Sequence, residues 1–153
     1  MDNELTRKKG ITLRESAKKL LIAELTWKGG LCSETKMGNH IVVTDSSADE
    51  GGNDLGPAPT ELFLAALGGC IMINISRIAK KMRIGLKSVR MKISGIKEHN
   101  KHPSTFIELR VDVAIDANIN DRAKLEKLVR LAGENCTVSN TLRRAVNPIL
   151  HLG

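Results

Sequence analysis

The sequence predicts an α+β protein that combines helices with antiparallel strands. A long apolar segment, residues 62–82, has the length and composition of a buried helix. Apolar residues alternate with polar ones in two later runs, 87–99 and 104–117, as in half-buried strands. The short polar segment between these runs predicts an antiparallel turn. Residues 121–135 carry one apolar stripe and predict a second helix.

Length and composition predict one domain. The chain has 153 residues, and we assign all of them to a single domain, with residues 1–18 as a polar N-terminal extension. Aromatic residues make up only 2%, so the core must be built from Leu, Ile, Val, Ala and Met. The polar N-terminus resembles no targeting peptide, and no uninterrupted apolar run reaches the ~18 residues of a membrane span. We therefore expect a cytoplasmic protein without a membrane partner.

The positive charge of the chain predicts a solvated basic surface. Lys and Arg number 24 against 17 Asp and Glu, which gives a formal net charge of +7. The cations recur at helix and strand spacings, and neither a pair of RNA-binding aromatic residues nor a helix-turn-helix signature accompanies them. We therefore expect no nucleic-acid partner.

The N-terminal third predicts short strands and a long loop. Residues 18–27 are compatible with a helix or a strand, and Gly29-Gly30 ends this run. Residues 39–45 form a β-rich run, which could pair with the first run as a hairpin through the polar stretch between them. Residues 46–59 are rich in Gly, Ser, Asp and Pro and predict a long loop.

The long helix has recognisable start and stop signals. Pro59 precedes Thr60, which is expected to cap the helix, and Glu61 suits the positive end of the helix dipole. Gly85 is the expected stop, with Arg83 in the last turn.

Two adjacent glycines in this helix need an explanation. Gly68 and Gly69 cost roughly 1 kcal/mol each against alanine. Removing two side chains lets another backbone or helix approach closely. We therefore expect a crevice at this point, beside Cys70.

The C-terminal part predicts a broken helix and a last strand. Asn118 or Asn120 is expected to cap the second helix. Thr137 and Ser139 are common at helix starts, so Cys136 should lie at a break between two helical pieces. The final segment, residues 148–153, is expected to form a short strand that closes a sheet.

Neither the cysteines nor the histidines predict a metal site. Cys32, Cys70 and Cys136 form no CxxC pair and no zinc-finger spacing. His99 and His102 fall in the predicted turn, where we expect solvent-exposed side chains. No metal and no cofactor are expected, and Cys32 is expected to be a small buried hydrophobic residue.

Cys70 and Cys136 allow two interpretations. Unpaired amides at a helix start lower the pKa of a thiol, and a thiolate attacks peroxides and disulfides. Two cysteines on neighbouring helices could therefore form a redox couple through a sulfenic acid and a disulfide. Two inert buried thiols are the alternative.

Two motifs resemble the OsmC/Ohr family of peroxide-reducing proteins: "GPAPTELFLAALGGC" and "ENCTVSNTL". The segments "LTWKGGL" and "GGNDLG" also stand in the expected order, so the resemblance covers about residues 20–150. It implies antiparallel sheets packed around two central helices, in an intertwined homodimer with active sites at the interface. It further implies that Cys70 is the peroxidatic and Cys136 the resolving cysteine. The substrate would be an organic hydroperoxide, with a thiol or dithiol as reductant.

The chain departs from the family pattern at three places. The family's catalytic glutamate position is Thr60 here, and no arginine occurs between residues 27 and 40. Thr137 replaces the proline that follows the second cysteine. Because the activating Arg/Glu pair is missing, the alternative function is an OsmC-like redox-sensing or small-molecule-binding protein with little turnover.

Glu61 is the remaining acidic candidate. It precedes Cys70 by nine residues, about 13 Å along a straight helix, so it cannot touch the thiol within the same helix. Its predicted role is either to cap the helix start or to act in catalysis through a bent helix entry or a partner chain.

Overall fold

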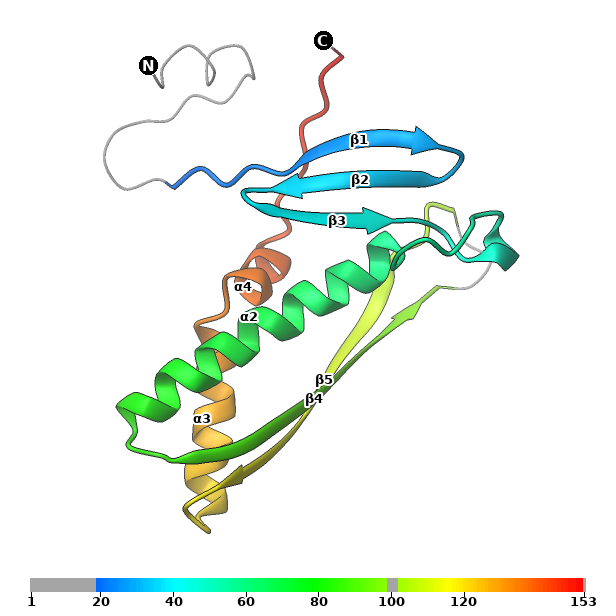
Figure 1. Cartoon of the computed structure of the whole chain (residues 1–153). Helices are drawn as coiled ribbons and strands as arrows, with labels where there is room; N and C mark the ends of the chain where they lie inside the picture. Colours follow the sequence, from blue (N-terminus) through cyan, green and yellow to red (C-terminus); the bar gives the residue numbers. More distant parts are fainter. Residues whose placement is uncertain (1–18, 99–101, 153) are drawn as a thin grey trace. The chain divides into compact units, whose positions relative to one another are not determined.

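A computed structural model describes residues 19–98 and 102–152, which fall into two compact units (Figure 1). The first unit is Met1–Pro57 and the second is Ala58–Gly153. The predicted N-terminal extension and His99 lie outside the described residues. The described chain confirms an α+β architecture with antiparallel sheets.

The first unit contains a three-stranded antiparallel sheet. Its strands are β1 (Glu24–Gly29), β2 (Cys32–Met37) and β3 (His40–Thr44), in the order β1-β2-β3. Gly30 and Gly38 have φ angles of 54° and 59°, which the two tight turns require.

The polar stretch expected to connect a hairpin is itself the central strand β2, so that prediction is wrong. Its polar side chains are accommodated by cross-strand hydrogen bonds: the Ser33 and Thr44 hydroxyls lie 2.8 Å apart. This strand does not need alternating apolar residues, which is why its pattern was missed.

The loop after β3 is folded around one buried carboxylate. Asp45 is 1% exposed and accepts N–H bonds from Ser46, Asn53 and Leu55, at 2.8, 3.0 and 3.4 Å. A short 3₁₀ helix, η1 (Ala48–Glu50), lies within the loop. The predicted loop is therefore present, but it is internally ordered.

The second unit begins with the long helix α2 (Pro59–Lys81). Ala58 is the N-cap, and the Glu61 carboxylate accepts the Ala58 N–H at 2.8 Å. The predicted Thr60 cap is wrong, because Thr60 already lies inside the first turn. By length and composition alone α2 could cross a membrane, a property shared by core helices of soluble proteins.

The helix ends four residues before the predicted stop at Gly85. Met82 is the C-cap, and Arg83 follows with a left-handed φ of 55°. The Arg83 N–H binds the Lys80 carbonyl at 3.2 Å, and the Ile84 N–H binds the Ala79 carbonyl at 2.9 Å. This pattern is a Schellman motif, in which glycine is the usual left-handed residue.

Arg83→Gly is therefore expected to stabilise the protein by about 1 kcal/mol, because glycine adopts this φ without the steric cost of a Cβ. Urea unfolding followed by circular dichroism measures the change. The matched control is Arg77→Gly at an exposed position inside α2, which should lose about 1 kcal/mol. Equal signs for the two variants would contradict the assignment.

A long hairpin and two shorter helices complete the second unit. The hairpin strands are β4 (Leu86–Lys97) and β5 (Phe106–Ala117), and the helices are α3 (Arg122–Glu134) and α4 (Thr137–Arg144). Half-buried and exposed residues alternate through most of both strands, as predicted. No strand forms among the described residues that follow α4, so the predicted last strand is wrong. Pro148, which has no N–H to donate to a ladder, lies in this segment.

The predicted caps of α3 are also wrong. Asp121 is the N-cap, and its carboxylate accepts the Lys124 N–H at 2.9 Å. Asn118 instead fixes the start of β4, because its side-chain oxygen accepts the Gly85 N–H at 2.7 Å while its own N–H binds the Gly85 carbonyl at 2.8 Å.

The buried core of the second unit is shared by α2, α3 and the chain beside them. The apolar stripe predicted for α3 contributes two fully buried residues, and α2 contributes four members. The members are Leu67, Ile71, Ile75, Ala79, Ile84, Leu128, Ala132 and Cys136. Cys136 is therefore part of the core rather than of a surface loop.

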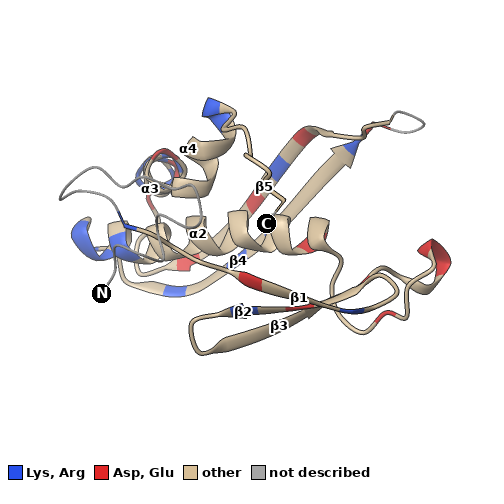
Figure 2. Ribbon diagram, turned by 90° about the horizontal axis from the view of Figure 1, so that it is seen from above, with Lys and Arg blue, Asp and Glu red and all other residues tan. Residues whose placement is uncertain are grey.

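Charged side chains are spread along the elements of the second unit. Along β5 one basic residue stands between acidic ones (Figure 2): Arg110 lies between Glu108 and Asp112, and Asp116 follows. Two ion pairs join successive turns of α3, Arg122–Glu126 and Arg130–Glu134. Such exposed pairs contribute little stability, about 0.5 kcal/mol or less.

Candidate functional site

The two adjacent glycines of α2 have different surroundings. Gly68 is buried, and a Cβ there would overlap the Ile93 side chain of β4. The predicted close approach is thus to a strand rather than to a helix. Gly69 is exposed and has open space where a Cβ would stand. Gly69 precedes Cys70 directly in the chain, so the helix surface there carries no side chain.

Cys136 stands at the start of α4. It is the N-cap residue, as the predicted helix break implies, and its sulfur accepts the Ser139 N–H at 3.3 Å. Its side chain is fully buried. A cysteine in this position receives an unpaired amide and the positive end of the α4 dipole.

These contacts change the acidity of the thiol. Burial by itself raises the pKa of Cys136, but hydrogen bonds from the Cys70 side chain, the Ser139 hydroxyl and N–H, and the Val138 N–H outweigh it. The pKa of Cys136 is therefore lower than that of an ordinary cysteine. This direction was predicted from the helix break.

Cys70 is the accessible partner of this pair. It is half-buried and packs against the core cluster that contains Cys136, and its side chain helps to lower the pKa of Cys136. The Asn74 amide lies one turn later, donates to the Cys70 carbonyl at 2.9 Å and approaches the Cys70 sulfur at 3.9 Å. Both cysteines are free thiols in this structure.

The structure brings together two of the three predicted site residues. Cys70 and Cys136 meet, whereas Glu61 is engaged with Ala58 at the first turn of α2, about 13 Å from Cys70 along the axis. Two roles were left open for Glu61, and its hydrogen bond with Ala58 corresponds to the capping role. Asn74 and Ser139 touch the thiols and were missed as site residues. Their signals were a polar residue in an apolar helix and an N-cap type after a cysteine.

Cys32 lies in the first unit. It begins β2 and is 7% exposed, as expected for a small buried hydrophobic residue. Within residues 19–98 and 102–152, no three His, Cys, Asp or Glu side chains gather as metal ligands. His102 is exposed, and its predicted partner His99 is not described.

A mainly apolar cavity of about 660 Å³ opens between the start of α2, the turn end of the β4–β5 hairpin and α4. Phe63 and Phe106 stack in its wall with ring centroids 5.6 Å apart. The full lining is Pro59, Thr60, Phe63, Lys97, Ser104, Thr105, Phe106, Leu109 and Leu142. The same two helices that carry the cysteines, α2 and α4, therefore also border this cavity.

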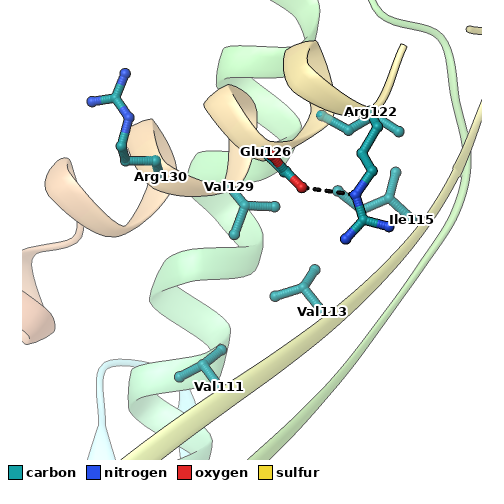
Figure 3. A pocket seen from close by; sticks show the side chains of 8 residues that line it. Val111, Val113, Ile115, Arg122, Glu126, Val129 and Arg130 are labelled. Atoms are coloured by element: carbon teal, nitrogen blue, oxygen red, sulfur yellow. Dashed lines mark hydrogen bonds and ion pairs between the residues drawn. The ribbon is translucent and has the colours of Figure 1, made fainter. Parts of the chain in front are cut away.

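A second cavity of about 490 Å³ lies between β5 and α3 (Figure 3). Its floor is the apolar row Val111, Val113 and Ile115, and its rim carries the Arg122–Glu126 ion pair at 2.8 Å. No cysteine lines either of these two cavities, but the first one is bordered by α2 and α4, the helices next to the thiol pair.

Fold and site together define an antiparallel α+β protein with a two-cysteine centre between its core helix and a second helix start. The family model for OsmC-like proteins matches residues 51–151, and the chain belongs to this family. Protein YhfA of Escherichia coli K-12 is 27% identical over 128 residues, which cover 82% of this chain and 91% of that protein.

Solved structures agree on the fold. An OsmC-like protein from Mycoplasma pneumoniae superposes with a TM-score of 0.73 at 15% identity, over 82% of this chain and 88% of that one. An organic hydroperoxide resistance protein, OsmC, from Legionella pneumophila gives a TM-score of 0.57 at 26% identity, over 84% and 92%. The resemblance to the OsmC/Ohr family is therefore confirmed.

Proposed function

We propose that this protein is a thiol-dependent peroxidase that reduces organic hydroperoxides through Cys70 and Cys136. The observation that carries the proposal is the pair of free thiols: one half-buried next to the exposed Gly69, the other held at a helix start with a lowered pKa. The description of the Legionella relative as an organic hydroperoxide resistance protein supports the choice of substrate.

The chemistry needs only these two sulfurs and an external reductant. The Cys70 sulfur attacks the outer oxygen of the hydroperoxide, the O–O bond breaks, and the alkoxide leaves and is protonated to the alcohol. Cys70 is now a sulfenic acid. The Cys136 thiolate attacks its sulfur, a disulfide forms, and hydroxide leaves and is protonated to water. A thiol or dithiol then returns two electrons, which suits a cytoplasmic location.

The cavity between α2, the hairpin and α4 suits the organic part of the substrate. Phe63 lies two helical turns before Cys70, about 10 Å along α2, and Leu142 lies six residues after Cys136. Phenyl and leucyl walls favour an alkyl or aryl group over water. We therefore propose organic hydroperoxides rather than hydrogen peroxide as the preferred substrates.

Mass spectrometry after one equivalent of cumene hydroperoxide tests the proposal. The reduced protein should lose two hydrogen atoms in mass, and peptide mapping should find a Cys70–Cys136 disulfide. An unchanged mass, or oxidation no faster than that of free cysteine, would refute the proposed peroxidase function.

One observation favours a second candidate function. Thr60 occupies the position of the family's glutamate and lines the cavity, while Glu61 is held by the Ala58 N–H. With no carboxylate placed at the thiol pair, the chain could bind a small apolar molecule or sense oxidation with little turnover. One oxidation event per chain without recycling by dithiols would distinguish this role.

We also propose that two copies form a homodimer. Large apolar side chains stay exposed on the single chain, including Ile73 on α2 and Ile149, Leu150 and Leu152 after α4. Burying such residues favours association. Sedimentation equilibrium at micromolar concentration should give twice the chain mass of 16.7 kDa, and Ile73→Asp should shift the distribution toward monomer. A wild-type protein that sediments only as a monomer would refute the dimer.

A further inference from the structure

The thiol pair lacks the residues that activate the attacking cysteine in related proteins, and this raises the question of what removes the Cys70 proton. We propose that Cys136, besides closing the disulfide, accepts the proton of the Cys70 thiol as Cys70 attacks. This inference rests on the proposed function, since it assigns a second role within the same site. Cys136 would then act in catalysis before any disulfide forms.

The surroundings of Cys136 favour a negative charge on its sulfur. The Ser139 N–H donates to this sulfur at 3.3 Å, and the first turn of α4 supplies further unpaired amides. Cys70 packs against the core cluster to which Cys136 belongs, and its side chain contributes to the lowered pKa of Cys136. Full burial prevents Cys136 itself from meeting a substrate.

The surroundings of Cys70 favour attack but not charge. Cys70 is half-buried next to the exposed Gly69, and the single hydrogen bond found to its sulfur is the long one from Asn74, at 3.9 Å. The stronger bond of the Asn74 amide goes to the Cys70 carbonyl. The accessible sulfur therefore has no strong anion stabiliser of its own in the described chain.

Other titratable groups lie farther from the pair. On α3, Glu134 is exposed and paired with Arg130 at 2.7 Å, and on α4 the basic residues Arg143 and Arg144 are in the last turn. On α2, the acidic residue of the first turn, Glu61, is engaged with Ala58. The hydrogen-bonding side chains that set the acidity of Cys136 are those of Cys70 and Ser139.

The step balances without a further reagent. As the Cys70 sulfur forms its bond to the outer peroxide oxygen, its proton moves to the Cys136 sulfur. The O–O electron pair leaves with the alkoxide, which takes the proton from Cys136 and departs as the alcohol. Cys136 is again a thiolate and attacks the sulfenic acid; hydroxide leaves and is protonated to water.

The pH profile of Cys70 alkylation by iodoacetamide tests this role without a peroxide. In the Cys32→Ser background, the rate should inflect at a lower pH than in the same protein with Cys136→Ser. Near neutral pH, loss of Cys136 should slow alkylation about tenfold, and the two rates should converge at alkaline pH. Ser139→Ala, which keeps both cysteines and the N–H, should shift the profile the same way by less. The control Ser76→Ala, on the exposed side of α2, should leave it unchanged.

Identical profiles with and without Cys136 would overturn the proton-acceptor role. The first-turnover rate with cumene hydroperoxide should follow the same pH dependence. If alkylation shifts as expected but the hydroperoxide is not consumed, the thiol pair stands and the peroxidase function fails. If the hydroperoxide is consumed with an unshifted profile, the peroxidase function stands and Cys136 only resolves.

Discussion

Cys70→Ser should abolish the reaction with the first equivalent of organic hydroperoxide. The accessible sulfur is then gone, and the remaining buried thiol of Cys136 cannot reach the substrate. We expect a loss of at least about a thousandfold, equivalent to ~4 kcal/mol of activation free energy. Stopped-flow consumption of cumene hydroperoxide by the reduced protein measures it.

Cys136→Ser should give a different result. Cys70 still reacts once, more slowly near neutral pH, but no second thiol closes the disulfide. The product is a Cys70 sulfenic acid that dimedone traps and mass spectrometry locates. The reverse pattern, an inert Cys136→Ser and a trapped sulfenic acid in Cys70→Ser, would exchange the two roles.

Cys32→Ser is the matched control, because it removes a buried thiol from the other compact unit. Peroxide consumption should stay within about twofold of wild type, roughly 0.4 kcal/mol of barrier. A loss greater than about tenfold would make Cys32 a working thiol and overturn the assignment of the couple.

The part of the fold that follows from apolar periodicity was predictable. Helix α2, the β4–β5 hairpin, α3 and the break at Cys136 all appear where the sequence predicts them. Each buries a face, so hydrophobic residues recur at the period of the element.

The elements whose partners are polar or absent were not predictable in this way. Strand β2 is polar and held by its two neighbours, so its sequence reads as a connection. The last segment reads as a strand, but nothing in the described chain pairs with it. Secondary structure in both cases depends on what lies beside the segment, which the local sequence does not contain.

The two cysteines of the site were predictable, but the polar residues that contact them were not. The motifs single out Cys70 and Cys136, and the helix break predicts the lowered pKa of Cys136. The contacts of Asn74 and Ser139 with the thiols depend on which side of each helix faces the other helix. That relation between α2 and α4 is set by tertiary packing, so the sequence left these two residues unassigned.

Asp45→Ala should destabilise the first unit strongly, by about 3 kcal/mol. The buried carboxylate of Asp45 accepts three backbone N–H groups of the following loop, from Ser46, Asn53 and Leu55. Alanine leaves these donors without their charged acceptor, and hydrogen bonds to a charged group contribute about 1.5–3 kcal/mol. Asp45→Asn keeps one acceptor oxygen and should lose about half as much.

The loop cannot easily rearrange to recover these bonds. A Cβ at Gly52 would overlap the Ser46 carbonyl, and one at Gly56 would overlap the Val43 carbonyl, so the backbone is closely packed at both points. Denaturant unfolding measures the stability, and amide hydrogen exchange at Asn53 and Leu55 locates the loss. Glu50→Ala, at an exposed position in the same loop, is the control and should change stability by less than about 0.5 kcal/mol. If Asp45→Ala behaves like this control and both amides stay protected, water or another acceptor satisfies the loop, and Asp45 does not organise it.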